Sequence, residues 1–129
     1  MKILLKEKDL ELIKECKRLL KENPNIKKRK LHLIKDLDKR FYYIRVWCIT
    51  ESQPLHVLRG YEKRCFRGVS CTHLDHIVPI IYGYNNNIPP EKIGGLTNLR
   101  FIRSTVNMRK GHKLTTESHK VLRKLKKKK

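Results

Sequence analysis

The sequence has no long hydrophobic run. A helix that crosses a bilayer needs roughly 18 to 20 predominantly apolar residues, and no stretch of this chain approaches that length. The first residues, MKILLKEKDL, hold only three consecutive apolar residues before charges resume, so we expect no signal peptide. These absences disfavour a membrane partner and predict a cytoplasmic protein.

Acidic residues are also scarce. The chain of 129 residues holds 12 Asp and Glu against 32 Lys and Arg, which gives a formal net charge of +20. An excess of this size predicts a polyanionic partner rather than a particular fold. With the membrane surface disfavoured, nucleic acid is the expected partner. A chain of 129 residues predicts one domain, or one small domain with appendages.

Paired C-x-x-C motifs are missing as well, so the strongest signal for a zinc finger or zinc ribbon is absent. In a cytoplasmic protein we expect the cysteines to be reduced. Cys65, Cys71 and His73 could supply three ligands of a structural zinc site. His112 or His119 would then be the fourth ligand. We favour the other interpretation, in which the cysteines are small buried hydrophobic residues, and assign no zinc ligand.

The first half of the chain predicts one helix and one strand. Ile13, Cys16 and Leu20 recur at helical spacing and predict an amphipathic helix from Asp9, its N-cap, to about Asn23. Residues 27–30 form a basic run that we expect to be solvated. Aromatic and β-branched types dominate residues 41–50, which favours a strand. Residues 51–68 show no clear periodicity and predict loop and short strand.

The second half predicts a strand, a long loop, a second strand and a short helix. The first strand covers residues 69–80 and is closed by Pro79, and residues 81–95, rich in Gly, Asn and Pro, must then be loop. Residues 99–102 are the second strand. Ser104 is a suitable N-cap for the helix, and Gly111 suits its end. A last helix could begin at Thr116 and end in a frayed basic tail.

Four side chains capable of chemistry fall at defined places in this order. Asp75 and His76 lie toward the end of the first strand, Asn98 where the loop enters the second strand, and Asn107 in the first turn of the helix. Each alone has an ordinary structural explanation. Their joint occurrence in a strongly basic chain favours a nuclease.

The pattern resembles the HNH, or ββα-metal, nuclease family, in particular its small phage-type members. Three segments carry the resemblance: Asp75-His76-Ile77-Val78-Pro79, Gly95-Leu96-Thr97-Asn98-Leu99 and Asn107-Met108-Arg109-Lys110-Gly111. It implies an α+β fold, a small single domain built around a ββα-metal motif, with an N-terminal amphipathic helix and a basic C-terminal tail. The expected divisions are an N-terminal helix and strand region at 1–68, the motif at 69–114 and the C-terminal helix or tail at 115–129.

The resemblance also implies a role for each side chain. Asp75 and Asn107 would hold one Mg²⁺ or Mn²⁺, because a carboxylate and an amide carbonyl are hard oxygen ligands. His76 would be the general base, and Asn98 would hold the loop by hydrogen bonds so that His76 points at the phosphate. The expected contacts to DNA phosphates are Arg100, Arg103, Arg109, Lys110 and Lys113.

The implied function is a metal-dependent endonuclease that hydrolyses phosphodiester bonds of double-stranded DNA and leaves a 5′ phosphate and a 3′ hydroxyl. The cleavage could be nicking or double-strand cutting, and the role could be homing, phage packaging or restriction. A homodimer is also possible. Many family members have His where this chain has Asn107. The amide oxygen in place of a ring nitrogen favours Mg²⁺ over zinc. The alternative function is a basic DNA- or RNA-binding protein without catalysis, since phosphate neutralisation alone explains the charge.

Overall fold

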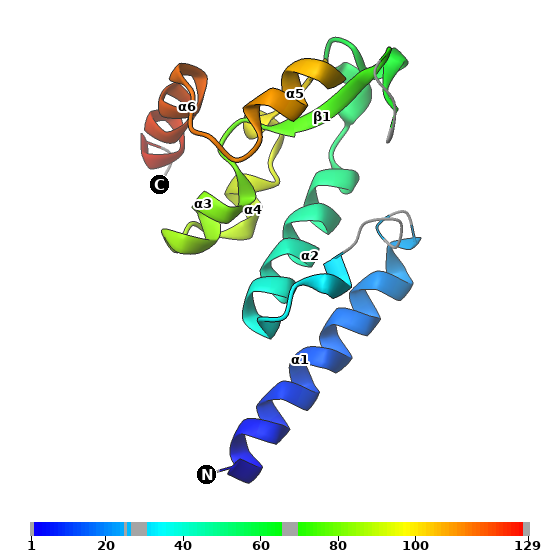
Figure 1. The fold of residues 1–129 in the computed structure, drawn as a ribbon, viewed down its shortest axis with the longest axis vertical. Coiled ribbons are helices and arrows are strands. Elements are labelled where there is room, and N and C mark those ends of the chain that lie inside the picture. Colours follow the sequence, from blue (N-terminus) through cyan, green and yellow to red (C-terminus); the bar gives the residue numbers. More distant parts are fainter. Residues whose placement is uncertain (1, 25, 27–30, 66–69, 128–129) are drawn as a thin grey trace. The chain divides into compact units, whose positions relative to one another are not determined.

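The structure, a computed structural model, describes residues 2–24, 26, 31–65 and 70–127. Within these residues, six α-helices and a two-stranded antiparallel sheet make an α+β fold (Figure 1). The α-helices are α1 (Lys2–Glu22), α2 (Leu37–Ser52), α3 (Ile80–Asn85), α4 (Pro90–Ile93), α5 (Ser104–Lys110) and α6 (Thr116–Lys127). The strands are β1 (Thr72–His76) and β2 (Leu99–Arg103). Short 3-10 turns are η2 (Leu31–Leu33), η3 (Leu55–Val57), η4 (Tyr61–Lys63) and η5 (Leu96–Asn98).

The chain divides into two compact units, Met1–Cys48 and Ile49–Lys129, and each is described by itself. None of the helices in the described ranges is long and apolar enough to cross a bilayer. The predicted basic run at residues 27–30 lies outside the described residues, as does the start of the predicted strand at Val69.

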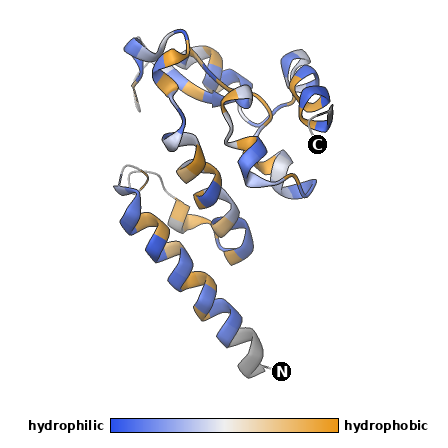
Figure 2. Ribbon diagram, turned by 180° about the vertical axis from the view of Figure 1, so that it is seen from behind, coloured by the Kyte–Doolittle hydropathy of each residue, from blue (hydrophilic) through white to orange (hydrophobic). Residues whose placement is uncertain are grey.

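In the first unit, the predicted N-terminal helix is confirmed, but it begins at Lys2 rather than at Asp9. Over the coloured part of α1, hydrophobic and hydrophilic residues are interspersed (Figure 2). The helix ends at Glu22, as predicted, and the amide Nδ2 of Asn23 donates to the carbonyl of Leu19 at 2.9 Å. The following Pro24 disfavours further helical turns.

The strand predicted at residues 41–50 is wrong, because these residues belong to α2. Strand propensity depends strongly on context, and aromatic and β-branched residues also fit a helix that buries them. Val46, Trp47 and Thr50 are all buried, at the spacing of neighbours on one helical face. Asp36, just before the helix, accepts a hydrogen bond from the backbone N–H of Lys39 at 3.2 Å, as an N-cap does.

The second unit contains the predicted hairpin. β1 and β2 pair antiparallel, with Asp75 opposite Arg100 and His76 opposite Leu99. The second strand is therefore confirmed and runs one residue further, to Arg103, whereas β1 begins at Thr72 and ends at His76. Helix α2 ends at Ser52, and residues 53–65 form no strand, only η3, η4 and an isolated bridge between Arg64 and Thr72.

The long loop predicted at residues 81–95 is wrong in part, because it contains α4 and most of α3. Helix α4 begins with Pro90, and the first helical position favours proline. Helix α3 begins directly after Pro79. Residues 86–89, between the two helices, stay outside regular structure. Both helices are short, and the Gly and Asn residues around them favoured the prediction of a loop over that of a helix.

The C-terminal helix predicted to begin at Thr116 is confirmed as α6. It continues to Lys127, so the frayed tail is wrong up to that residue, and residues 128 and 129 lie outside the described part. Its apolar side chains Val121, Leu122 and Leu125 are buried. The unit also buries apolar side chains of the hairpin and of the short helices: Leu55, Leu74, Val78, Ile80, Ile93, Leu99 and Phe101. This core fixes the hairpin that carries the candidate site.

Candidate functional site

The candidate site is built on β1, β2 and α5. Asn107 lies in the first turn of α5, as predicted, and Gly111 follows the helix with a φ of 55°, a conformation that favours glycine. The predicted capping role of Ser104 is wrong. Ser104 is the first helical residue, and its buried hydroxyl has no hydrogen-bond partner in the described structure.

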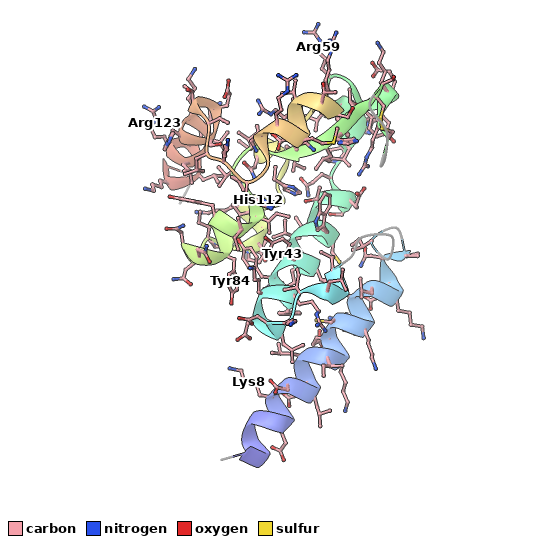
Figure 3. All side chains as sticks on the ribbon, in the orientation of Figure 1. Lys8, Tyr43, Arg59, Tyr84, His112 and Arg123 are labelled. Atoms are coloured by element: carbon pink, nitrogen blue, oxygen red, sulfur yellow. A yellow bond between two sulfur atoms is a disulfide. The ribbon has the colours of Figure 1, made fainter. Side chains whose placement is uncertain are left out.

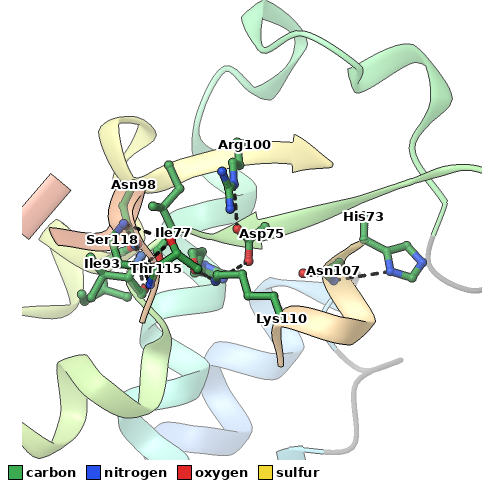
Figure 4. A network of polar contacts seen from close by, with 12 residues as sticks. His73, Asp75, Ile77, Ile93, Asn98, Arg100, Asn107, Lys110, Thr115 and Ser118 are labelled. Carbon is green, nitrogen blue, oxygen red and sulfur yellow. Dashed lines mark hydrogen bonds and ion pairs between the residues drawn. The ribbon is translucent and has the colours of Figure 1, made fainter. Parts of the chain in front are cut away.

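Asp75 is held between two cations. Its side chain is 5% exposed, and Arg100 Nε donates to Oδ2 at 2.8 Å while Lys110 Nζ donates to Oδ1 at 2.9 Å (Figure 4). Lys110 also donates to the carbonyl of His76 at 3.0 Å. Arg100 and Lys110, both predicted as phosphate contacts, therefore pair with the predicted metal ligand in this structure, and their contact with phosphate stays a prediction.

The carboxylate keeps some capacity to bind a metal. An ionised carboxylate has about four acceptor positions, and the two cations occupy one on each oxygen. The electrostatic balance is less favourable, because Arg100 and Lys110 together bring two positive charges to one negative charge and would repel a divalent ion.

Asn107 contacts a histidine of the same strand. Its Nδ2 lies 3.5 Å from Nδ1 of His73 (Figure 4). His73 precedes Asp75 by two residues on β1, so the two side chains share one face of the strand. That face carries the contacts to α5, since Lys110 and Asn107 both belong to this helix. His73 is half-buried, whereas His112 is exposed.

His76 points to the opposite face of β1. It is 7% exposed, and its Nε2 lies 2.9 Å from the hydroxyl oxygen of Thr50, on α2. Adjacent residues of a strand point to opposite faces, and the contacts of Asp75 and His76 follow this rule. The structure therefore does not bring the predicted base onto the face of the predicted metal ligands. Thr50 itself was missed because its segment was predicted to be a strand.

Asn98 makes the hydrogen bonds predicted for it. Its Oδ1 accepts from the backbone N–H of Val78 at 2.7 Å, and its Nδ2 donates to the carbonyls of Val78 at 3.1 Å and Ile93 at 2.8 Å. The side chain is fully buried. It thereby ties the turn after His76 to the end of α4.

The remaining predicted phosphate contacts are exposed: Arg103, Arg109 and Lys113. A cavity of about 680 Å³ lies beside Arg103. Its lining includes Arg59, just before η4, and Glu62 and Lys63 on η4. Figure 3 shows the side chain of Arg59 extending away from the ribbon. Arg59 and Lys63 add to the basic surface and carried no distinguishing signal among the other cations of the sequence.

Burial also affects the two cysteines of the first unit. Desolvation is the main cause that raises the pKa of Cys16 and of Cys48, so their thiols form thiolates less readily than usual.

A comparison of this chain with protein-family models, with curated proteins and with solved structures finds no match in any of the three.

Proposed function

We propose that this protein is a divalent-metal-dependent DNA endonuclease of the HNH type. The observation that carries the proposal is the position of Asp75 and Asn107. Both lie at the contact between α5 and β1 in a strand–strand–helix unit. Asp75 on β1 bonds to Lys110 on α5, and Asn107 on α5 contacts His73 on β1.

The donor set fits a hard cation. Asp75 offers carboxylate oxygens, and Asn107, whose Nδ2 faces His73, has its carbonyl oxygen left to offer. Oxygen ligands suit Mg²⁺ or Mn²⁺. When bound, such an ion stabilises negative charge on the scissile phosphate and on the departing 3′ oxygen.

His76 is the proposed general base for the attacking water. In this structure its Nε2 contacts Thr50, so accepting a proton on the Asp75 side requires the imidazole to leave that hydroxyl. Asn98 supports this part of the chain, because its hydrogen bonds fix the turn that follows His76. Asn98 is therefore a positioning residue in the proposed mechanism.

The exposed cations serve DNA binding. Arg103, Arg109 and Lys113 lie on β2, on α5 and just beyond α5, and have exposed side chains that phosphates can reach. Lysine and arginine contacts to phosphates position a duplex without reading its sequence. The net charge of +20 agrees with this mode of binding.

Two observations favour a second candidate, a basic nucleic-acid-binding protein without catalysis. Asp75 is already neutralised by Arg100 and Lys110, and His76 faces away from it. In this alternative the ion pairs stabilise the hairpin, and the exposed cations bind phosphates.

Cleavage of supercoiled plasmid separates the two candidates. The endonuclease nicks or linearises plasmid in Mg²⁺ or Mn²⁺, is inactive in EDTA, and loses activity in Asp75→Asn and His76→Ala. His112→Ala, which removes an exposed histidine, is the matched control and keeps full activity. Intact plasmid in both metals, together with a gel shift, would support the non-catalytic candidate. Cleavage by His76→Ala at the wild-type rate would remove His76 from the mechanism.

A further inference from the structure

Two cysteines and a histidine meet at the start of β1. The sulfurs of Cys65 and Cys71 and a ring nitrogen of His73 all lie within 4.8 Å of one another. In this structure the two cysteines form a disulfide, which differs from the reduced state expected from the sequence. All three residues are half-buried, so the group is partly shielded from solvent.

The backbone holds this group in place. The N–H of Cys65 donates to the carbonyl of Thr72 at 2.9 Å, and the carbonyl of Cys71 accepts from the N–H of Ser104 at 3.0 Å. Cys65 is thereby tied to β1, and Cys71 to the first residue of α5. Both bonds involve backbone atoms only, so they do not depend on whether the sulfurs are joined.

His73 supplies a second, independent observation. Its Nδ1 faces Asn107, but its Nε2 is buried and has no hydrogen-bond partner among the residues that the structure describes. A buried polar atom without a partner costs free energy, and such an atom calls for an explanation such as a missing ion. A metal ion on Nε2 would satisfy it.

We propose that, in the reduced chain, Cys65, Cys71 and His73 bind a thiophilic divalent ion of the zinc class. The disulfide first takes up two electrons and two protons from a thiol or phosphine reductant, which is itself oxidised. The two thiols then release their protons as their sulfurs bind the ion as thiolates. The disulfide and the metal site are alternative states of the same two sulfurs, and the site does not depend on the proposed nuclease activity.

The ligand types determine the metal. Two thiolates and an imidazole favour zinc over the Mg²⁺ proposed for Asp75. Among the described residues no further His, Cys, Asp or Glu joins the group, so one coordination position is left for water. His112 and His119, considered as a fourth ligand from the sequence, are both exposed and stand outside the group.

The site also reaches the proposed Mg²⁺ ligand. A metal on Nε2 of His73 places the ring proton on Nδ1, and the neighbouring Asn107 can accept that proton only through its carbonyl oxygen. The amide of Asn107 would then turn over relative to its present orientation, in which Nδ2 faces the ring. Zinc binding would therefore turn the carbonyl oxygen of Asn107, the proposed Mg²⁺ ligand, toward His73.

The test is a cobalt titration of the full chain after reduction and removal of reductant and metal. We expect one Co²⁺ per chain, with a thiolate-to-cobalt charge-transfer band and tetrahedral visible bands that Zn²⁺ abolishes. The same protein with its disulfide intact should show neither band. Reduced protein without these bands, or equal binding by the oxidised protein, would overturn the proposal.

Variants and protection locate the site. Cys71→Ser and His73→Ala should lose the bands, whereas Cys16→Ser and Cys48→Ser, matched controls outside the group, should keep them. In the unmutated chain, zinc should protect Cys65 and Cys71 from alkylation in peptide mapping and leave the reactivity of Cys48 unchanged, a result that does not depend on variant folding. Asp75→Asn should still bind cobalt, because Asp75 is not one of the three ligands. An unmutated chain that shows the cobalt bands but does not cleave plasmid would count against the nuclease alone.

Discussion

Lys110 offers the sharpest test of the Asp75 site. Its side chain is 5% exposed, and its ammonium donates to Asp75 Oδ1 at 2.9 Å and to the carbonyl of His76 at 3.0 Å. Lys110→Met keeps much of the side-chain volume but removes both bonds. Removing one partner of a buried ion pair costs roughly 3–5 kcal/mol. Because Arg100 still neutralises Asp75, we expect a smaller loss, about 2–3 kcal/mol.

The assay is urea unfolding followed by circular dichroism, first in EDTA. Lys113→Met is the matched control, because it removes the same charge from an exposed position just beyond α5 and should change the free energy of unfolding by only about 0.5 kcal/mol. The double variant Asp75→Asn/Lys110→Met should lose less than the sum of the two single variants, since the two residues act as a pair.

Repeating the assay in Mg²⁺ connects the ion pair to the metal. Without the Lys110 ammonium, the carboxylate of Asp75 repels a divalent ion less, so Mg²⁺ should stabilise Lys110→Met more than it stabilises the wild type. At a free Mg²⁺ concentration of about 100 times the Kd, the gain would be about 2.7 kcal/mol. Equal stability of Lys110→Met and Lys113→Met would refute the buried pair. An equal effect of Mg²⁺ on wild type and Lys110→Met would refute competition for Asp75.

Three further predictions test the neighbouring residues. Thr50→Val should cost about 1–3 kcal/mol of unfolding free energy, because it leaves buried His76 without the Thr50 hydroxyl, and Thr50→Ser should cost less in the same urea assay. Asn98→Ala should lower the free energy of unfolding by roughly 2–4 kcal/mol, since three buried backbone groups lose a partner. The control Asn86→Ala removes one exposed bond to Tyr82 and should cost under about 1 kcal/mol. Equal losses would contradict the supporting role of Asn98. Changing Arg103, Arg109 and Lys113 together to Ala should weaken binding to all duplex sequences alike and flatten its salt dependence in fluorescence anisotropy, and an unchanged slope would exclude these residues from the interface.

The hairpin and α5 were predictable because local signals agree there. β-Branched and apolar residues mark β2, Gly111 marks the end of α5, and the interval between Asn98 and Asn107 leaves room for one strand and a helical turn. The hydrogen bonds of Asn98 were implied by the family resemblance, and its side chain makes them at the entry to β2. These features depend on contacts that are close in sequence or on backbone geometry, which a single sequence records.

Helix α2 and the partners of Asp75 were not predictable in the same way. Residues 41–50 have the composition of a strand, and only their burial at helical spacing shows the helix. Lys110 is one of many lysines in the chain, and the sequence gives no sign that this one reaches a carboxylate on β1. Such pairings depend on tertiary packing, which overrides local propensity.

The opposite directions of Asp75 and His76 bear on how the proposed nuclease would work. An Asp-His pair in a regular strand cannot direct both side chains to one ion, because the strand alternates its faces. Here His76 is the last residue of β1 and Asn98 fixes the turn immediately after it, so a small change of backbone at the strand end would be enough to rotate the imidazole. Lys110 contacts both Asp75 and the carbonyl of His76, so an ion that displaces this lysine also releases a bond at that strand end. Metal binding and the release of His76 from Thr50 are therefore expected to be coupled. Lys110→Met should accordingly loosen His76 before any metal is added, and hydrogen exchange at the amides of Ile77 and Val78 in EDTA measures that change against Lys113→Met.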